Sequence, residues 1–401
     1  MDDRDSPAQS GRPGRSASAV RHAGELEARG LRQAVIGALR SQGFVIDENQ
    51  ALGRASDSKD AAREMNRQAV ASRRERARAR LARHESRLLD RFADGRDVVP
   101  ARIRPVLVPV ARRSEEELLF RYASLHWSIP VSRGYGRRIR FIVVDGHNGK
   151  LIGLLGLGDP VYALAPRDEW VGWNERQRRE RLWHVLDAFV LGAVPPYNRL
   201  LGGKLIAMLA TSREIREAFA DRYLDRRTRV GGRRFNDGLA MLTTTSALGR
   251  SSLYARLRDR RGVDIWHPVG YTAGSGDFHF GDDLYERLAA FLREHEPATA
   301  KHEGWGTGYR NRREVIGKAL RLLGLPYHWV YHGIRREVYC APLAANARDF
   351  LTGRAAGLDV GAWSADEAFA WFRERWLLAR ARRIDDWRDF ERESLRLWGD
   401  G

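Results

Sequence analysis

The sequence predicts an α/β (α+β) fold with a central mixed sheet flanked by helices. Between residues 101 and 297, apolar runs rich in β-branched residues alternate with charged, helix-forming stretches. The chain has 401 residues and 43% hydrophobic content, which is enough to bury a sizeable core. We expect four consecutive segments: a disordered tail over 1–23, an Arg-rich helical segment over 24–100, an α/β core over 101–297 and a small C-terminal α+β unit over 298–401.

The composition of the N-terminal hundred residues predicts three kinds of segment in succession. Residues 1–23 are rich in Ser, Gly, Pro and Arg and poor in large apolar residues, a composition typical of disorder. Apolar residues at helical spacing predict a helix over 26–41, and a short strand is expected at 43–46. Residues 60–92 lack Pro and Gly and consist of strong helix formers, so we expect one long, exposed, Arg-rich helix there.

In the predicted core, a strand over 103–110 is followed by a helix that begins after Ser114, a residue able to cap it. Two apolar runs, 140–144 and 151–157, are separated by DGHNG. Asp-Gly and Asn-Gly between apolar runs are strong hairpin signals, so we expect these strands to pair. The other expected elements are helices over 174–187, 200–211, 213–223, 251–260, 282–293, 312–323 and 365–382, and strands over 188–194, 239–245, part of 266–280, 327–331 and 337–341.

The net charge of the chain suggests its partner. The formal charge is +18 and the isoelectric point is about 10.6. Such a field attracts polyanions, so nucleic acid is the partner that the composition favours. Nearly all of the charge is arginine, with only five lysines. The alternative is therefore an Arg-rich composition that gives a basic surface without any binding function.

The single cysteine, Cys340, excludes an intramolecular disulfide and a thiolate metal cluster, and it suits a reducing, cytoplasmic compartment. No apolar run reaches the roughly 18 residues that a membrane helix needs, and the N-terminus lacks the apolar segment of a secretory signal. We expect a cytoplasmic protein with no membrane partner.

The expected helix over 60–92 is the first candidate functional element. A basic helix without a wide apolar stripe is a candidate nucleic-acid contact. The alternative is a solvated helix in which glutamates at 64, 75 and 85 pair with arginines at helical spacing. The candidate contact residues are Arg73, Arg74, Arg76, Arg78 and Arg80.

A second candidate site lies in VPPYNRLLGGKL (194–205), which we interpret as a strand end, a loop with paired glycines and a helix start. Open backbone amides at a helix N-terminus bind phosphate, and glycine permits close approach. No Ser or Thr follows Lys204, which argues against a nucleotide-hydrolysing P-loop. The alternative is that the glycines only let two backbones pack closely. The candidate cofactor-binding residues are Asn198, Leu201, Gly202, Gly203 and Lys204.

This second segment resembles the CoA-pyrophosphate loop of GNAT-type N-acyltransferases. The preceding order of strand, helix, hairpin and strand is similar to that fold, and TTTSALGRSSLYARL (243–257) resembles its later strand and helix. The resemblance implies a GNAT-like core, CoA or acyl-CoA as cofactor, and Tyr254 as the general acid that protonates the leaving thiolate.

The third segment, APRDEWVGW (165–173), carries a more specific resemblance. The run GLLGLGDPVYALAPRDEWVGW, followed by Gln-Arg and then a Leu and a Val three residues apart, is similar to the DruA family of the Druantia anti-phage system, formerly the DUF4338 domain. The likeness covers roughly residues 121–271 and leaves out the N-terminal Arg-rich segment. It implies a component of a multi-protein anti-phage defence system that includes a large helicase-type protein.

Two residues of APRDEWVGW are candidates for chemistry. Arg167 can act as a fork for phosphate or carboxylate, and Asp168 as its orienter or as a base. The alternative is a buried structural pair beside Trp170 and Trp173. Asp168 and Tyr254 are thus the candidate catalytic residues, and Arg167 joins the candidate anion-binding arginines.

Histidines provide weaker signals. His267, Asp277 and His279 lie in one Gly-rich segment, and His328 and His332 lie four residues apart. Neither group has a spacing typical of metal ligands, and the alternative for both is packing, so no metal site is predicted.

The leading hypothesis is a DruA-like defence protein that acts on or is bound to DNA through an Arg-rich surface. A CoA-dependent acyltransferase is the first alternative, and a DNA strand-processing enzyme is the second. The sequence does not decide whether the protein is an enzyme.

Overall fold

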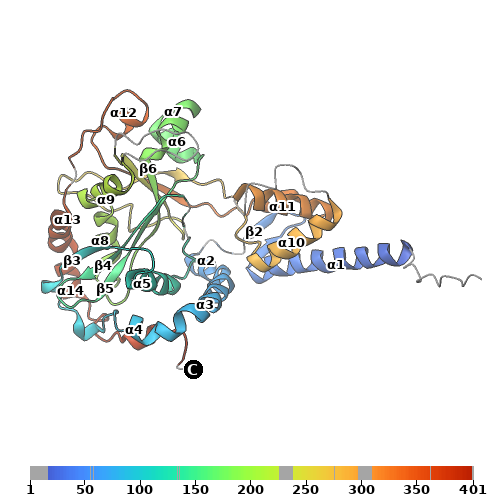
Figure 1. The fold of residues 1–401 in the computed structure, drawn as a ribbon, viewed down its shortest axis with the longest axis horizontal. Coiled ribbons are helices and arrows are strands. Elements are labelled where there is room, and N and C mark those ends of the chain that lie inside the picture. Colours follow the sequence, from blue (N-terminus) through green and yellow to red (C-terminus); the bar gives the residue numbers. More distant parts are fainter. Residues whose placement is uncertain are drawn as a thin grey trace, which may run out of the picture. The chain divides into compact units, whose positions relative to one another are not determined.

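The computed structural model describes residues 17–54, 56, 58–132, 134, 136–224, 238–274, 276–296, 309–361 and 363–399. The chain divides into two compact units (Figure 1): unit 1 combines Met1–Ser56 with Ser275–Gly333, and unit 2 combines Asp57–Gly274 with Ile334–Gly401. Each unit therefore joins stretches that are distant in sequence. The segment boundaries expected at residues 24, 101 and 298 stay a prediction.

Unit 2 contains the mixed sheet that the sequence predicts, with seven strands. All neighbouring strands are antiparallel apart from the parallel pair β6–β7. In spatial order the strands are β3 (Pro105–Pro109), β4 (Arg138–Asp145), β5 (Leu151–Gly158), β6 (Val185–Ala193), β7 (Met241–Thr245), β9 (Glu337–Pro342) and β8 (His267–Tyr271).

The expected hairpin is confirmed, since β4 and β5 pair in antiparallel register around the Asp-Gly/Asn-Gly turn. The buried carboxylate of Asp145 holds this turn. It accepts hydrogen bonds from the backbone N–H groups of Arg104 (2.9 Å) and His147 (3.0 Å) and from the hydroxyl of Tyr197 (3.0 Å). Because Tyr197 follows β6, the hairpin turn is bonded directly to the loop that holds the paired glycines.

Helices cover both faces of the sheet (Figure 1). The side chains of β4 alternate between the two faces, as strand geometry requires: Phe141 and Val143 join one core cluster and Ile142 joins another. The helices and turns of unit 2 are α2 (Lys59–Met65), α3 (Arg67–Leu81), η1 (Ala82–His84), α4 (Glu85–Leu89), η2 (Gly95–Asp97), η3 (Pro100–Arg102), α5 (Glu115–Ala123), η4 (Ser124–His126), α6 (Ala165–Val171), α7 (Glu175–Arg181), η5 (Leu182–His184), α8 (Gly202–Leu209), α9 (Arg213–Tyr223), α12 (Ala347–Leu351), α13 (Ala365–Phe372), the π-helical turn η7 (Arg373–Leu377), α14 (Leu378–Arg383) and η8 (Arg392–Leu395).

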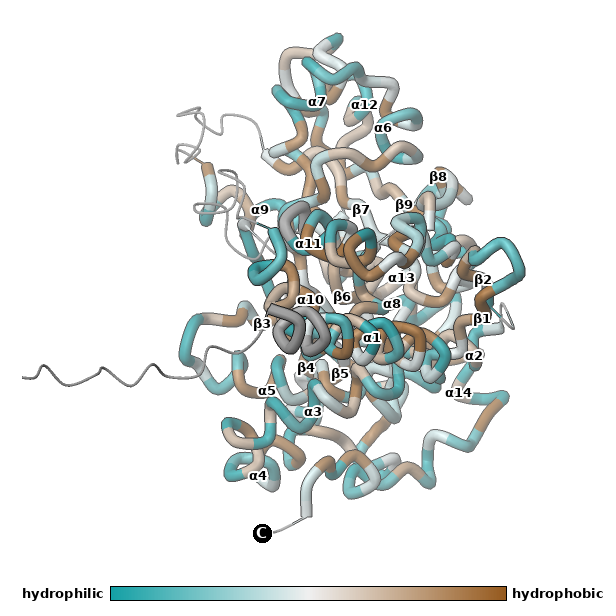
Figure 2. The backbone as a smooth tube through the Cα atoms, turned by 90° about the vertical axis from the view of Figure 1, so that its right-hand side faces the viewer, coloured by the Kyte–Doolittle hydropathy of each residue, from teal (hydrophilic) through white to brown (hydrophobic). Residues whose placement is uncertain are grey.

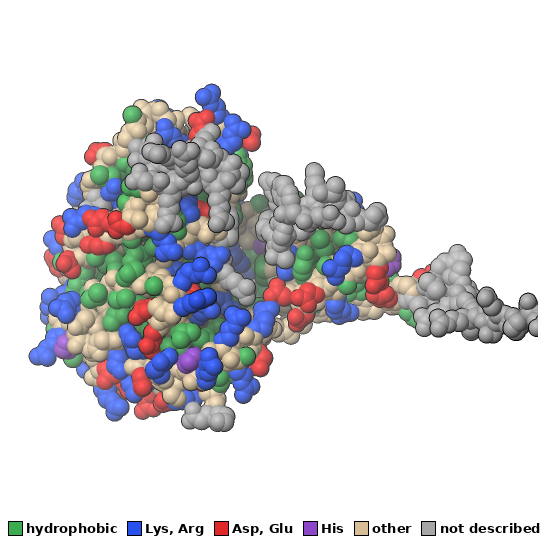
Figure 3. Space-filling model, viewed as in Figure 1, with side chains coloured by type: hydrophobic (Ala, Val, Ile, Leu, Met, Phe, Trp, Pro, Cys, Tyr) green, Lys and Arg blue, Asp and Glu red, His purple; other side chains and the backbone are tan. Residues whose placement is uncertain are grey.

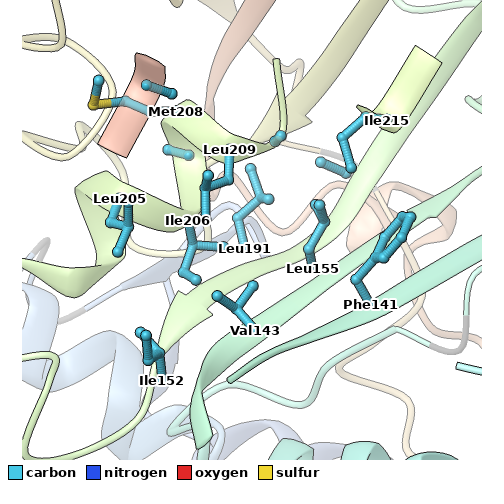
Figure 4. Packing of buried hydrophobic residues seen from close by; sticks show 14 of the residues in the cluster. Phe141, Val143, Ile152, Leu155, Leu191, Leu205, Ile206, Met208, Leu209 and Ile215 are labelled. Atoms are coloured by element: carbon cyan, nitrogen blue, oxygen red, sulfur yellow. The ribbon is translucent and has the colours of Figure 1, made fainter. Parts of the chain in front are cut away.

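The main core lies between α8 and the sheet. Figure 4 shows Leu205, Ile206 and Leu209 of α8 beside Leu155 and Leu191 of the strands, and all five belong to one core cluster. This packing fixes the position of the α8 N-terminus relative to β6.

Unit 1 is a small helical unit with one hairpin. Its elements are α1 (Ala17–Ser41), β1 (Phe44–Ile46), β2 (Leu52–Arg54), α10 (Asp282–His295), α11 (Tyr309–Leu322) and the 3₁₀ turn η6 (Tyr327–Val330). Hydrophobic and hydrophilic colours alternate along α1 in Figure 2, and its Leu31, Val35 and Leu39 are buried at helical spacing. The helix expected at 26–41 is confirmed but begins earlier, at Ala17, so the last residues of the expected tail are helical. Residues 1–16 of that tail lie outside the described residues.

The single long helix expected over 60–92 is wrong. The chain forms α2, α3 and α4, with Asn66 between the first two and the 3₁₀ turn η1 between the last two. Asn66 is buried and donates its side-chain amide to the carbonyl of Ala62 (2.9 Å), which competes with helix continuation. The turn at 82–84 lets Leu81 and Leu88 enter the same core cluster.

Two further helices differ from the sequence prediction. The helix expected over 174–187 ends at Arg181, and β6 begins at Val185, because the apolar run 185–194 is buried on both sides within the sheet. The helix expected over 251–260 is absent. Residues 252–256 form turns instead, and the hydroxyl of Tyr339 holds both the N–H and the carbonyl of Ser251 (3.1 and 3.2 Å).

The C-terminal region also differs. The strand expected near 327–331 is the 3₁₀ turn η6. The strand expected at 337–341 is present as β9, which pairs with both β7 and β8 and so belongs to the central sheet. Sequence order hides this pairing, because nearly a hundred residues separate β7 from β9.

Candidate functional site

The candidate arginines of α3 divide into two groups. Val70, Arg73, Arg74, Ala77 and Leu81 are the half-buried or buried positions of the helix and recur at helical spacing. The Arg73 guanidinium donates to the carbonyl of Val131 and lies 3.5 Å from the Ser124 hydroxyl, and Arg74 Nε donates to the carbonyl of Leu125 (3.2 Å). These two side chains therefore hold α3 against the segment that follows α5.

The other arginines of this segment face outward. Arg76, Arg78 and Arg80 are exposed, and so is Arg83 in the following turn. Arg78 lies 3.9 Å from Glu75, an exposed ion pair of the kind that contributes little to stability. We call Arg76 and Arg80 of α3 together with Arg83 of the following turn η1 the outer arginine row, because all three are exposed and follow one another at intervals of four and three residues. Figure 3 shows Lys and Arg side chains gathered where Figure 1 labels α2 and α3.

The Arg167–Asp168 pair of α6 is buried. Arg167 is 0% exposed, and its guanidinium donates to Asp168 Oδ1 (2.8 Å) and to the carbonyls of Val161 (2.8 Å) and Tyr162 (2.9 Å). It also lies 5.6 Å from the ring centroid of Trp173. A phosphate from solution does not reach a guanidinium in this position.

The carboxylate of Asp168 is also fully hydrogen-bonded. Besides Arg167, its carboxylate accepts hydrogen bonds from Trp173 Nε1 (3.0 Å), Arg178 Nη1 (3.0 Å) and the backbone N–H of Leu164 (3.1 Å). Both oxygens are thus occupied by donors that close the segment 161–178 on itself. The geometry supports the structural alternative for this pair, and its anion-binding and catalytic assignments stay predictions.

The paired glycines are closely packed. A Cβ atom on Gly202 would lie 2.7 Å from the carbonyl oxygen of Tyr197 and 2.8 Å from Ala193 Cβ. A Cβ atom on Gly203 would lie 2.7 Å from Leu253 Cδ1. Leu201 adopts a left-handed conformation (φ 63°) as the residue before α8. The loop backbone thus requires glycine at position 202, whereas a side chain at position 203 would displace only the end of the Leu253 side chain.

The backbone amides of this loop are also in use. The N–H of Gly202 donates to the carbonyl of Tyr197 (2.9 Å), and that of Leu201 donates to the carbonyl of Asn198 (3.2 Å). The ammonium of Lys204 donates to the carbonyl of Ser252 (3.3 Å), and burial, together with nearby Arg256, lowers the pKa of Lys204. The geometry leaves little room for a pyrophosphate, and CoA as a cofactor stays a prediction.

Tyr254 lies in the turn that replaces its expected helix. Its ring is buried between Trp266 and Tyr339, with centroids 5.3 and 5.0 Å away. Burial raises the pKa of Tyr254 to about 12, partly offset by a hydrogen bond with Thr244. The structure does not bring Tyr254 together with Asp168, since no contact joins them among the described residues, and the role of Tyr254 as an acid stays a prediction.

Comparison with known proteins decides the family. The family model described as Druantia protein DruA matches residues 56–353. The chain belongs to the DruA family. It is 39% identical over 358 residues to Druantia protein DruA of Escherichia coli (strain UMEA 4076-1), an alignment that covers 89% of this chain and 88% of that protein. No solved structure matches the chain.

DruA membership makes this protein a component of an anti-phage defence system, as the APRDEWVGW segment implied. The family match begins at residue 56 and therefore includes α3, beyond the range 121–271 expected from the sequence. The outer arginine row thus lies within the DruA family region. In the part of the chain that the structure describes, no helix is long and apolar enough to cross a membrane.

Sequence reasoning missed one titratable residue of this DruA-family protein. Asp187 is half-buried near the start of β6, where its Oδ1 accepts a hydrogen bond from Thr243 Oγ1 on the parallel strand β7 (2.9 Å). Burial raises the pKa of Asp187 to about 6, and the Thr243 bond and the Arg167 charge offset part of this effect. An aspartate inside the apolar run VLDAFVLGA was the available signal, but it was assigned to a helix end.

The histidine groups contribute no site. Asp277 is bonded to Arg312 (2.9 Å), and buried His279 bonds through Nε2 to the carbonyl of Trp329 (2.7 Å). His267 of β8 lies 5.5 Å from Trp170. These contacts are those of packing residues.

Proposed function

We propose that this DruA-family protein contacts nucleic acid, and DNA in the first place, through the outer arginine row of α3 and η1. The observation that supports the proposal is that the arginines of α3 and η1 divide into inward-facing and exposed ones. Arg73 and Arg74 turn inward and hold α3 in place, whereas Arg76, Arg80 and Arg83 are exposed. A helix held in this way presents its outer charges at fixed spacing, so less conformational entropy is lost on binding a polyanion.

The contact is mainly with phosphate rather than with bases. Arginine forms paired hydrogen bonds to phosphate oxygens, and a phosphate contact carries no sequence information by itself. Among the described residues, no acidic side chain pairs with Arg80. We therefore expect binding that depends strongly on salt and weakly on sequence.

Fluorescence anisotropy with a labelled 20-base-pair DNA duplex over a potassium chloride series tests the proposal. The logarithm of the affinity should fall linearly with the logarithm of the salt concentration, with a slope of about −0.9 for each phosphate contact. The triple variant Arg76→Gln, Arg80→Gln, Arg83→Gln should reduce the steepness of that slope by about 3.

A matched control removes the same charge elsewhere. Arg261, Arg354 and Arg388 are exposed arginines, each paired with a nearby aspartate. Their triple replacement by Gln should leave the slope nearly unchanged. Absence of duplex binding by the wild-type protein, or an equal loss in both triple variants, would contradict the proposal, because the second result would mean that total charge alone matters.

The family resemblance adds a second part to the proposal, namely a helicase-type protein as partner within a multi-protein defence system. A DNA-bound DruA-family protein and a helicase would meet on the same substrate. Co-purification of the full-length protein with the other proteins of its system, with and without nuclease treatment, tests this part. Loss of the complex after nuclease treatment would show that DNA mediates the association.

A further inference from the structure

Unit 1 exposes two tyrosine rings on one short turn. Tyr327 is 45% exposed and Tyr331 is 49% exposed, at the start of η6 and directly after it. The residues between them fix the turn, since Trp329 is buried and donates its Nε1–H to the carbonyl of Gln50 (2.7 Å). The two rings are therefore attached to an ordered backbone while much of their surface faces solvent.

The ring of Tyr327 lies directly on the backbone of α11. A Cβ atom on Gly317 would lie 2.3 Å from Tyr327 Cε2, so only glycine leaves room for the ring. Part of the ring is thus covered by the helix, while 45% of the residue stays exposed. The ring is positioned in advance without being buried.

Arginines accompany both rings. The Arg313 guanidinium lies 5.0 Å from the centroid of Tyr331, and that of Arg321 lies 6.0 Å from the centroid of Tyr327. Arg313, Gly317 and Arg321 are four residues apart and so share one side of α11. From Tyr309 to Gly333 the sequence has five basic residues and one acidic residue. The surroundings of the rings therefore favour a polyanion over a neutral protein surface.

We infer that Tyr327, Tyr331, Arg313 and Arg321 form a binding surface for unpaired, single-stranded nucleic acid. Bases stack on the open tyrosine faces, and the guanidinium groups contact the phosphates. Bases within a duplex are already stacked, so a duplex does not use such a surface. The inference rests on the proposed function in that the partner is again nucleic acid, but it uses different residues and a different form of that partner.

Anisotropy titrations of the full-length protein separate the two surfaces. The probes are a labelled 20-mer of deoxythymidine, an abasic 20-mer with the same phosphates, and the 20-base-pair duplex. Tyr327→Ala with Tyr331→Ala should weaken binding of the thymidine 20-mer about tenfold or more and change duplex binding less than twofold. Tyr327→Phe with Tyr331→Phe should retain binding, because stacking needs the ring and not the hydroxyl. The wild-type protein should bind the abasic strand about as weakly as the alanine variant binds the thymidine strand.

Several results would overturn the inference: unchanged binding of the thymidine strand by the alanine variant, equal affinity of the wild-type protein for the abasic and thymidine strands, or no binding of either strand, which would assign the surface to a protein partner. The triple variant of the outer arginine row distinguishes failure of this inference from failure of the proposed function. If that variant binds the duplex normally while the tyrosine variant loses the single strand, the proposed function fails and this inference stands.

Discussion

A buried glutamate fastens the C-terminal segment of unit 2, and its removal gives a quantitative test of the structure. Glu85 is 3% exposed and begins α4. Its carboxylate accepts hydrogen bonds from the hydroxyl of Tyr122 (2.8 Å) and from the backbone N–H groups of Leu397 (2.7 Å) and Trp398 (3.1 Å). Trp398 is itself buried in the cluster that contains α4 and α5.

Glu85→Ala should therefore loosen residues 395–399. A hydrogen bond to a charged group contributes about 1.5–3 kcal/mol, and a buried donor left unpaired costs a similar amount. The amide of half-buried Leu397 can bond to water instead, so we count only the Tyr122 hydroxyl and the Trp398 amide, which gives about 3–6 kcal/mol in total. Glu85→Gln keeps the side-chain volume and one acceptor oxygen, so its stability should lie between those of the wild type and Glu85→Ala.

Hydrogen exchange measured by mass spectrometry on C-terminal peptides reports this loss directly, because the affected amides are the exchanging groups. We expect exchange of the Leu397 and Trp398 amides to accelerate about a hundredfold or more in Glu85→Ala. Ser394→Ala is the matched control, since its exposed hydroxyl only donates to the carbonyl of Glu391. Wild-type exchange rates in Glu85→Ala would refute the assignment of Glu85 as the fastening group.

Three further predictions concern other buried groups. Burial, with nearby Arg74, lowers the pKa of His126 to about 4. The unfolded chain therefore binds a proton near pH 6.5, whereas the folded protein does not. The free energy of unfolding should fall as pH drops from about 6.5 towards 4. His126→Phe should make this fall shallower in chemical denaturation at several pH values, and an unchanged pH dependence would contradict the argument. Gly202→Ala should lower the free energy of unfolding in urea titrations by about 1–3 kcal/mol, because the added Cβ meets the backbone of Tyr197. Gly203→Ala should have a smaller effect, because its Cβ meets the end of the Leu253 side chain. The reverse order would count against the loop packing described above. Asp168→Asn should lower the free energy of unfolding by about 3–5 kcal/mol in the same titrations, because it leaves the charge of Arg167 buried without its partner. A change below about 1 kcal/mol would show that this pair has no structural role.

Local sequence signals predicted the local structure well. The hairpin of β4 and β5 follows from Asp-Gly and Asn-Gly between apolar runs, and Ser114 caps α5 as expected, accepting from the Glu117 N–H. The mixed sheet flanked by helices was also predicted. These features depend on a few neighbouring residues, so a single sequence contains the information they need.

Features that depend on distant partners could not be predicted. Nothing local distinguishes Arg74, which bonds to a carbonyl fifty-one residues away, from exposed Arg76. The helical pattern of residues 251–260 is overridden by Tyr339, which lies on a strand far along the chain. Asp187 was assigned to a helix end, because its neighbour Thr243 and the buried surroundings of β6 appear only once the sheet is assembled.

The position of β9 limits how this protein is made and how it can be shortened. β9 is the strand between β7 and β8, yet it follows both in the chain, and β8 has no other partner in the sheet. During synthesis, β7 and β8 therefore leave the ribosome with open edges that stay unpaired until residues 337–342 emerge. The unpaired backbone N–H and C=O groups of such edges can pair with strands of other chains and so promote aggregation. A fragment that ends before Pro342 keeps both edges open, so a soluble truncation must extend past this strand.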